Sequence, residues 1–274
     1  EIVNDETADQ NLRYIGADPN NYVTFNNESW RIIGVMNNID DGTGVQESRL
    51  KIIRNSSIGN YSWSNTYGNN NWSISEMQEV LNSGAYWNRT TGNCPYGNNN
   101  FTSCNFSTNG MSDDGKRFIK EAKWNLGGIS QRNANSLLAN DFYSAERGDD
   151  VYELNDVSWI GNIAFLYVSD YAYATSGDET FNRESCLNTV LYNWSGSSSC
   201  YLNNWLYSPT TSKWTLNVPS NSSLNAFLID TFDAFTLYSP VSSYAVYPVT
   251  YLRADVKITS GTGSASDPYI LSIE

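Results

Sequence analysis

The sequence predicts an α+β fold in which two strand-rich chain ends flank a helical middle. Three observations carry this prediction: short β-prone runs before residue 55, apolar residues at helical spacing between 73 and 147, and short strands separated by turns from residue 213 onward. Because helices and strands are segregated along the chain, a parallel doubly wound sheet is not expected. The 274 residues suit one domain over 1–274, with two lobes as the alternative.

The N-terminal part of the chain predicts a group of neighbouring strands. Tyr22–Phe25 is a short β-prone run, and Ser29–Met36 is a stronger one after an Asn-Asn turn. Arg49–Arg54 is the expected hairpin partner of this second strand, across the turn-rich loop 37–44. Residues 55–72 are expected to form a loop.

The middle of the chain predicts three helices. Ser73 and Glu76 have the spacing of a capping box, ahead of a helix that stops near Gly84. Residues 88–112 are expected to be irregular. A second helix is expected to start at Ser112 and to end at the glycine pair 127–128, and a third helix is expected over 134–147.

The rest of the chain predicts strands again. The apolar run 160–168 is expected to be a buried strand, whereas 169–212 shows few periodic segments. Short strands separated by turns are expected from residue 213 to the end, at 214–218, 225–230, 234–238, 243–247, 249–254, 256–259 and before residue 273.

Four cysteines fall in two local pairs, Cys94 with Cys104 and Cys186 with Cys200. Of the three possible pairings, these two short-range disulfides are the simplest, and each would contribute roughly 3 kcal/mol in the chain-entropy model. They would indicate an exported protein. The alternative is four free buried thiols in a cytosolic protein.

Charge and composition exclude several classes of function. Against 16 Lys and Arg stand 29 Asp and Glu, a net charge of −13, which argues against nucleic acid and against an anionic membrane surface as partners. The chain has no histidine, so His-based acid–base catalysis and nucleophilic triads are excluded. A glycosidase needs only two carboxylates, but spacing in the sequence selects no pair, and we expect no enzyme activity.

No apolar run approaches the roughly 18 residues of a membrane span. The first ten residues are polar and do not read as a signal peptide. We therefore expect a soluble, exported ectodomain from which a leader or an anchor has been trimmed.

Eight segments spread over most of the chain form a familiar set: Asn11–Met36, Lys51–Arg54, Ala122–Gly128, Leu166–Thr175, Asn204–Tyr207, Trp214–Leu216, Val246–Leu252 and Ile258–Leu271. Together they resemble a family of uncharacterised surface-protein domains of Firmicutes and related bacteria. That family is similar to the C-type-lectin and formylglycine-generating-enzyme superfold. The resemblance implies a C-type-lectin-like domain, with antiparallel strands from both chain ends, on the bacterial cell surface.

The resemblance brings no chemistry with it. Tyr247 stands where the wider group usually has an arginine before Pro248, so an arginine-dependent role is not carried over. Some relatives follow a prepilin-like helix, which makes a pilus subunit one of the alternatives.

Two aromatic stretches suggest a carbohydrate-binding site, because aromatic rings stack on sugar faces and Asn side chains bind hydroxyls. The predicted ligand-binding residues are Tyr61, Trp63, Tyr67 and Trp72 in the first stretch, and Tyr192, Trp194, Tyr201, Trp205 and Tyr207 in the second. The predicted ligand is a polysaccharide or a host glycan. The alternative for these rings is that they pin long loops onto the core. The alternative function is a protein-binding adhesin ectodomain or a prepilin-type pilus subunit that self-assembles.

Calcium is a possible cofactor, because oxygen ligands are plentiful and C-type-lectin-like folds often carry it. The candidate acidic turns are Asp40–Gly42, Asp149–Asp150 and Asp178–Glu179, but the first lacks the spacing of an EF-hand loop. The sequence therefore selects no metal ligands. Trp30, Trp124, Trp159 and Trp214 lie in periodic segments and are assigned to the core.

Overall fold

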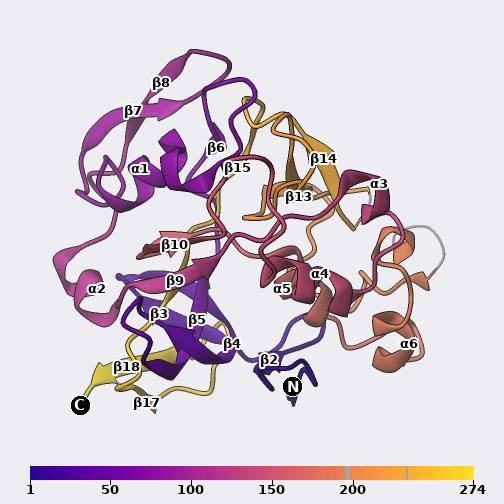
Figure 1. The fold of residues 1–274 in the computed structure, drawn as a ribbon. Helices are drawn as coiled ribbons and strands as arrows, with labels where there is room; N and C mark the ends of the chain where they lie inside the picture. Colours follow the sequence, from indigo (N-terminus) through magenta and orange to yellow (C-terminus); the bar gives the residue numbers. More distant parts are fainter. Residues whose placement is uncertain (195–197, 233) are drawn as a thin grey trace.

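A computed structural model describes residues 1–194, 198–232 and 234–274. The fold is α+β, with most of the regular structure in sheets and only short helices (Figure 1). The large sheet lies in the lower part of Figure 1 together with both chain termini, and the helices of the middle region lie to its upper left and to its right.

The large sheet joins the two ends of the chain. Its strand order is β11-β16-β5-β4-β3-β18-β17, with β2 also paired to β4 and β1 paired to β2. Strand β18 is parallel to β3, and the other pairs are antiparallel. The bounds are β1 Ile2–Asn4, β2 Leu12–Tyr14, β3 Tyr22–Phe25, β4 Glu28–Asp40, β5 Gln46–Arg54, β11 Ile163–Ala164, β16 Val249–Tyr251, β17 Val256–Ser260 and β18 Tyr269–Ile273.

Three smaller sheets complete the β structure. A five-stranded sheet has the order β14-β13-β12-β15-β6, and two further antiparallel pairs are β10-β9 and the hairpin β7-β8. The bounds are β6 Asn60–Ser62, β7 Thr91–Pro95, β8 Phe101–Asn105, β9 Ala122–Asn125, β10 Ser158–Gly161, β12 Lys213–Trp214, β13 Ala226–Ile229, β14 Thr236–Tyr238 and β15 Ser243–Ala245.

The helices are short and separate the sheets. Helix α1 lies beside the β7-β8 hairpin at the upper left of Figure 1, and α3 to α6 lie on its right. The bounds are α1 Glu76–Asn82, α2 Asp113–Phe118, α3 Gln131–Ala134, α4 Ala139–Glu146, α5 Val168–Tyr173 and α6 Arg183–Leu187, with 3-10 turns η1 Trp72–Ile74 and η2 Leu191–Asn193.

The strands predicted at both chain ends are confirmed. Strands β3, β4 and β5 pair in the predicted order, although β4 runs on to Asp40, so that half of the predicted loop 37–44 is strand. Most of the C-terminal strands are shorter than predicted, whereas β17 runs one residue further than predicted, to Ser260. Ser112 caps the second helix as predicted, because its side chain accepts a hydrogen bond from Gly115 N.

Several predictions for the middle of the chain are wrong in detail. The second helix ends at Phe118, and residues 122–125 form β9, whose Trp124 lies opposite Trp159 of β10. Pairing with β10 and packing of the Trp124 ring on Tyr167 and Tyr251 override the helical spacing of the segment. The third helix is divided into α3 and α4, the run 160–168 contributes to β10, β11 and α5, and the expected irregular stretch 88–112 contains the β7-β8 hairpin.

A buried group of charged side chains ties the N-terminus to the middle of the chain. Arg13 pairs with Asp5 at 2.8 Å and with Asp170 at 2.7 Å, and Lys51 Nζ lies 2.5 Å from the second oxygen of Asp170. All four side chains are at most 2% exposed. Burial alone would raise the pKa of Asp170, but Lys51 and Arg13 hold it at about 2, below its ordinary value.

The two local disulfides, Cys94–Cys104 and Cys186–Cys200, are confirmed. Disulfides are typical of proteins from oxidising compartments, which is consistent with an extracellular protein. None of the helices within the described residues has the length and apolarity needed to cross a membrane.

Candidate functional site

The tryptophans of the first aromatic stretch are core residues, which overturns the prediction that they offer ring faces to a ligand. Trp63 and Trp72 are 0% and 1% exposed, and their rings pack edge to face with centroids 5.3 Å apart. The indole N–H of Trp63 donates to Thr215 O at 3.1 Å. Tyr61 is half-buried in β6, and Tyr67 alone in this stretch is well exposed, at 59%.

The second stretch is arranged in the same way. Trp194 and Trp205 are buried, and their indole N–H groups donate to Cys186 O and Tyr14 O. Tyr201 and Tyr207 are half-buried and pack on each other with ring centroids 4.8 Å apart. Tyr192 is 39% exposed.

Both stretches therefore pin irregular loops onto the core, which was the alternative interpretation of these rings. The neighbouring asparagines serve the same purpose, since Asn70 Nδ2 donates to Ser222 O and Asn225 O, and Asn204 Nδ2 donates to Tyr171 O. Trp30, Trp124 and Trp214 are buried as predicted, and Trp159 is half-buried. Tyr67 and Tyr192 are the two predicted residues that keep a largely open ring.

Two of the three acidic turns considered for calcium are engaged within the protein. Asp178 accepts hydrogen bonds from Thr180 and Asn182 N. Asp40 accepts hydrogen bonds from Gly42 N and Gly44 N, and Asp41 accepts from Thr43 and pairs with Lys120 at 2.9 Å. Across the part of the chain that is described, three or more acidic or cysteine side chains do not gather into a group that could hold a metal ion.

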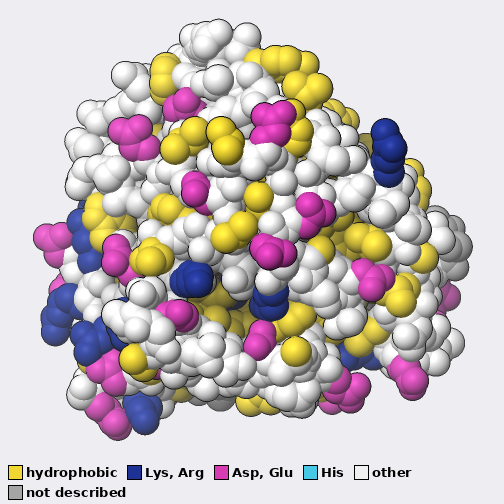
Figure 2. Space-filling model, viewed as in Figure 1, with side chains coloured by type: hydrophobic (Ala, Val, Ile, Leu, Met, Phe, Trp, Pro, Cys, Tyr) yellow, Lys and Arg dark blue, Asp and Glu magenta, His cyan; other side chains and the backbone are white. Residues whose placement is uncertain are grey.

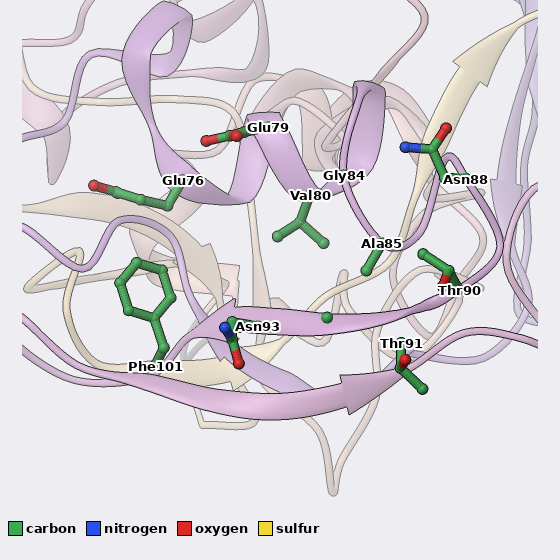
Figure 3. A pocket seen from close by; sticks show the side chains of 11 residues that line it. Glu76, Glu79, Val80, Gly84, Ala85, Asn88, Thr90, Thr91, Asn93 and Phe101 are labelled. Atoms are coloured by element: carbon green, nitrogen blue, oxygen red, sulfur yellow. The ribbon is translucent and has the colours of Figure 1, made fainter.

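A groove of about 470 Å³ opens between α1 and the β7-β8 hairpin (Figure 3). Val80 and Ala85 point into the space from the helix side. Glu76 and Glu79 extend from the helix at one end, and Phe101 faces them from the hairpin. The remaining polar residues of the lining are Asn88, Thr90, Thr91 and Asn93.

Local sequence fixes the helical wall of the groove. The helix begins after Ser75, whose side chain accepts a hydrogen bond from Gln78 N. Ser73, the predicted cap, lies two residues too early, in η1. Glu76 is therefore free of a capping role, and its carboxylate instead accepts hydrogen bonds from Ser64 Oγ and Asn65 N. The Glu79 side chain is exposed and makes no hydrogen bond or ion pair with the described residues.

The hairpin wall is held by covalent and hydrogen bonds. The Cys94–Cys104 disulfide crosses between β7 and β8. The tip of the hairpin is bonded to the first aromatic stretch, because Asn99 N donates to Asn65 O at 2.6 Å and Tyr67 N donates to Asn98 Oδ1 at 3.1 Å. The exposed ring of Tyr67 is thus carried by a loop bonded to the hairpin that supplies Phe101.

The groove combines the features of a site for a polyhydroxylated ligand. The Phe101 ring is 49% exposed, and the floor is apolar. Amide, hydroxyl and carboxylate groups surround the ring and the floor. The amides and hydroxyls can donate hydrogen bonds to the hydroxyl groups of a ligand, and all three kinds of group can accept hydrogen bonds from them. Sequence reasoning missed Phe101 and Glu79. The signal available was a lone aromatic residue inside a polar stretch closed by two cysteines.

Neutral polar surface dominates the face drawn in Figure 2, on which Lys and Arg side chains gather mainly toward the lower left. Such a surface presents hydrogen-bonding groups with little charge to neutral ligands. No protein-family model, curated protein or solved structure matches the chain. The resemblance to bacterial surface-protein domains therefore stays a prediction.

Replacing Gly92 with Ala is expected to push the hairpin away from α1. A Cβ at Gly92 would lie 2.8 Å from the Ala85 Cβ, so the walls of the groove cannot keep their present spacing. Such overpacking costs about 1–3 kcal/mol, measurable by chemical denaturation. The double variant Gly92→Ala with Ala85→Gly removes the clash and should recover most of the loss. No recovery would show that the close approach of these two residues is not what sets the spacing.

Proposed function

We propose that this chain is a non-catalytic carbohydrate-binding domain whose ligand occupies the groove between α1 and the β7-β8 hairpin. The observation that carries the proposal is the exposed Phe101 ring, set beside an apolar floor and surrounded by amide, hydroxyl and carboxylate side chains. An aromatic ring covers the apolar face of a sugar, while Asn and Thr side chains pair with its hydroxyl groups.

The ligand class is a polysaccharide or a host glycan. The groove has a volume of about 470 Å³, which gives room for part of a longer sugar chain. Tyr67 lies on the loop that the hairpin tip holds, and it provides a second exposed ring for a neighbouring unit. This arrangement replaces the tryptophan-lined site expected from the sequence.

The absence of catalysis belongs to the same proposal. Glu76 and Glu79 are the two carboxylates at the groove, and a glycosidase would need both to act on one bond. Both oxygens of Glu76 already accept hydrogen bonds from the loop 64–66, which supports an anchoring role. Glu79 remains as a hydrogen-bond acceptor for a hydroxyl group.

The proposal includes an extracellular position on a bacterial cell surface and a C-type-lectin-like arrangement of the domain. The two disulfides support the first part. Strand β18 from the C-terminus beside β3 from the N-terminus supports the second, because it brings both chain ends into one sheet.

Retention of the purified domain on insoluble polysaccharides tests the proposal. We expect retention on at least one of starch, cellulose, xylan and mucin, with no soluble sugar released from it. Loss of retention in EDTA would add calcium to the binding mechanism. A domain that passes through all four supports contradicts glycan binding and favours a protein partner, as for an adhesin or a pilus subunit. Release of soluble sugar would contradict the non-catalytic part.

A further inference from the structure

The chain buries two lysines, and they differ in how their charge is balanced. Lys51 is 1% exposed and has the carboxylate of Asp170 at 2.5 Å. Lys213, in β12, is 6% exposed and donates to a backbone carbonyl, Leu206 O, at 2.7 Å. Within the described residues no carboxylate lies at ion-pair distance from Lys213.

The charged neighbours of Lys213 are cations. Arg31, on β4, lines a small cavity together with Lys213, and the positive charges of the two side chains repel each other. Burial, and with it the charge of Arg31, lowers the pKa of Lys213 to about 8. Burying an ammonium group without a counter-ion is costly. A bound anion would lower the cost of burying the charge of Lys213.

Arg31 is held in place in a way that leaves part of its guanidinium available. Its Nε donates to Asn21 Oδ1 at 2.7 Å, and Nη2 donates to Asp18 Oδ1 at 2.9 Å and to Pro19 O. Its plane lies near the rings of Tyr22 and Trp205, with centroid distances of 4.1 Å and 4.7 Å. The Nη1 group makes no hydrogen bond inside the described part of the chain.

Between these two cations lies a small cavity of about 50 Å³. Trp205 and Tyr247 supply its aromatic walls, and the Tyr247 ring centroid lies 4.8 Å from Lys213 Nζ. Arg54 also borders the cavity, but its Nε and Nη2 donate to Glu28 and its Nη1 donates to Ser56 and Ser57. Arg31 also has a carboxylate partner, Asp18 at 2.9 Å, but its Nη1 group keeps its hydrogen-bonding capacity among the described residues. Arg31 and Lys213 are therefore the groups that can act on a bound anion.

We propose that the cavity lined by Arg31, Lys213, Trp205 and Tyr247 binds a carboxylate group. About 10–15 Å³ of such space holds one water molecule, so the cavity has room for a few groups of that size, and the three heavy atoms of a carboxylate fit it. A carboxylate can accept from the guanidinium and the ammonium together, and charge-assisted bonds of this kind are strong. The chain as a whole has a net charge of −13, so a cavity lined by two cations is an unusual place in it for an anion to bind.

The carboxylate has two possible sources, a free small acid or the acid group of a uronic sugar. The cavity is separate from the groove beside α1, so the test of carboxylate binding and the test of glycan binding can fail independently. Thermal unfolding at constant ionic strength tests it, with sodium chloride replaced stepwise by sodium acetate or by sodium glucuronate. A ligand that binds only the folded state raises the Tm with its concentration.

We expect the Tm of the wild type to rise with acetate, with glucuronate or with both. A rise with acetate indicates a free small acid, and a rise with glucuronate alone indicates a uronic sugar. The variant Lys213→Met keeps the packing of the side chain and removes its charge, so its Tm should not respond. Lys123→Met, at an exposed lysine of β9, is the matched control and should respond like the wild type. A wild type that does not respond, or a Lys213→Met variant that responds equally, would overturn the proposal.

A second variant keeps the test decisive if Lys213→Met does not fold. Arg31→Lys retains a cation but loses the planar fork, and we expect the carboxylate Kd to rise about tenfold. An unchanged Kd would remove Arg31 from the site and contradict the proposal. Equal stabilisation of the wild type by sulfate would show a general anion effect and would contradict selection of a carboxylate.

Discussion

Replacing Asp170 with Asn is expected to lower the free energy of unfolding by about 3–5 kcal/mol. The substitution keeps the size of the side chain but leaves Arg13 and Lys51 buried without the carboxylate that both contact. Asp170 Oδ2 also accepts from Tyr167 N at the start of α5, so the variant weakens the helix terminus as well. Equilibrium unfolding in urea measures the loss.

The control for this variant is Asp113→Asn, because Asp113 is fully exposed and pairs only with Lys116 at the surface. Its midpoint of unfolding should match that of the wild type. If Asp170→Asn unfolds at the same urea concentration as this control, the buried charges do not hold the N-terminus to α5.

The same carboxylate predicts a dependence of stability on pH. Its pKa in the folded protein is about 2, below the ordinary value of 3.8, so the folded state binds the proton less readily than the unfolded state. The contribution of Asp170 is complete above pH 4 and is lost as the pH falls toward about 2. In Asp170→Asn the stability should change less over this interval than it does in the wild type.

Replacing Trp63 with Ala is expected to destabilise the domain by about 3–5 kcal/mol. The side chain is fully buried against Trp72, and its removal leaves a large cavity and an unpaired Thr215 carbonyl. Unfolding in urea, followed by circular dichroism, measures the effect.

Tyr67→Ala is the matched control, because Tyr67 belongs to the same stretch but has an exposed ring. We expect its stability to stay within about 0.5 kcal/mol of the wild type. A Trp63→Ala variant as stable as Tyr67→Ala would mean that the ring is not a core residue, and would return it to the list of ligand-binding candidates.

The sequence predicts the parts of this fold that are governed by local patterns. The hairpin β4-β5 follows from two β-prone runs around a polar turn, and Ser112 is recognisable as a helix cap. The two disulfides follow from local cysteine pairs. The spacing of residues 122–125 predicts a helix, whereas pairing of Trp124 with Trp159, from a distant segment, makes these residues a strand.

The candidate site was less accessible to sequence reasoning. Trp63 and Trp194 lie in polar, irregular segments, and a linear pattern cannot tell an indole that binds a ligand from one that anchors a loop. Backbone carbonyls distant in the chain, such as Thr215 O for Trp63, make the difference. The groove forms between α1 and the β7-β8 hairpin. Because the sequence pattern does not predict this hairpin, it does not mark Phe101 as a candidate residue.

The binding of Phe101→Ala and Tyr192→Ala to the polysaccharide that retains the wild type tests the central claim most directly. Both residues have exposed rings, but Phe101 lines the groove and Tyr192 belongs to the second aromatic stretch. We predict at least a tenfold loss of affinity for Phe101→Ala, corresponding to about 1.4 kcal/mol, and wild-type affinity for Tyr192→Ala. Wild-type affinity in Phe101→Ala with loss in Tyr192→Ala would contradict the assignment of the groove as the binding site.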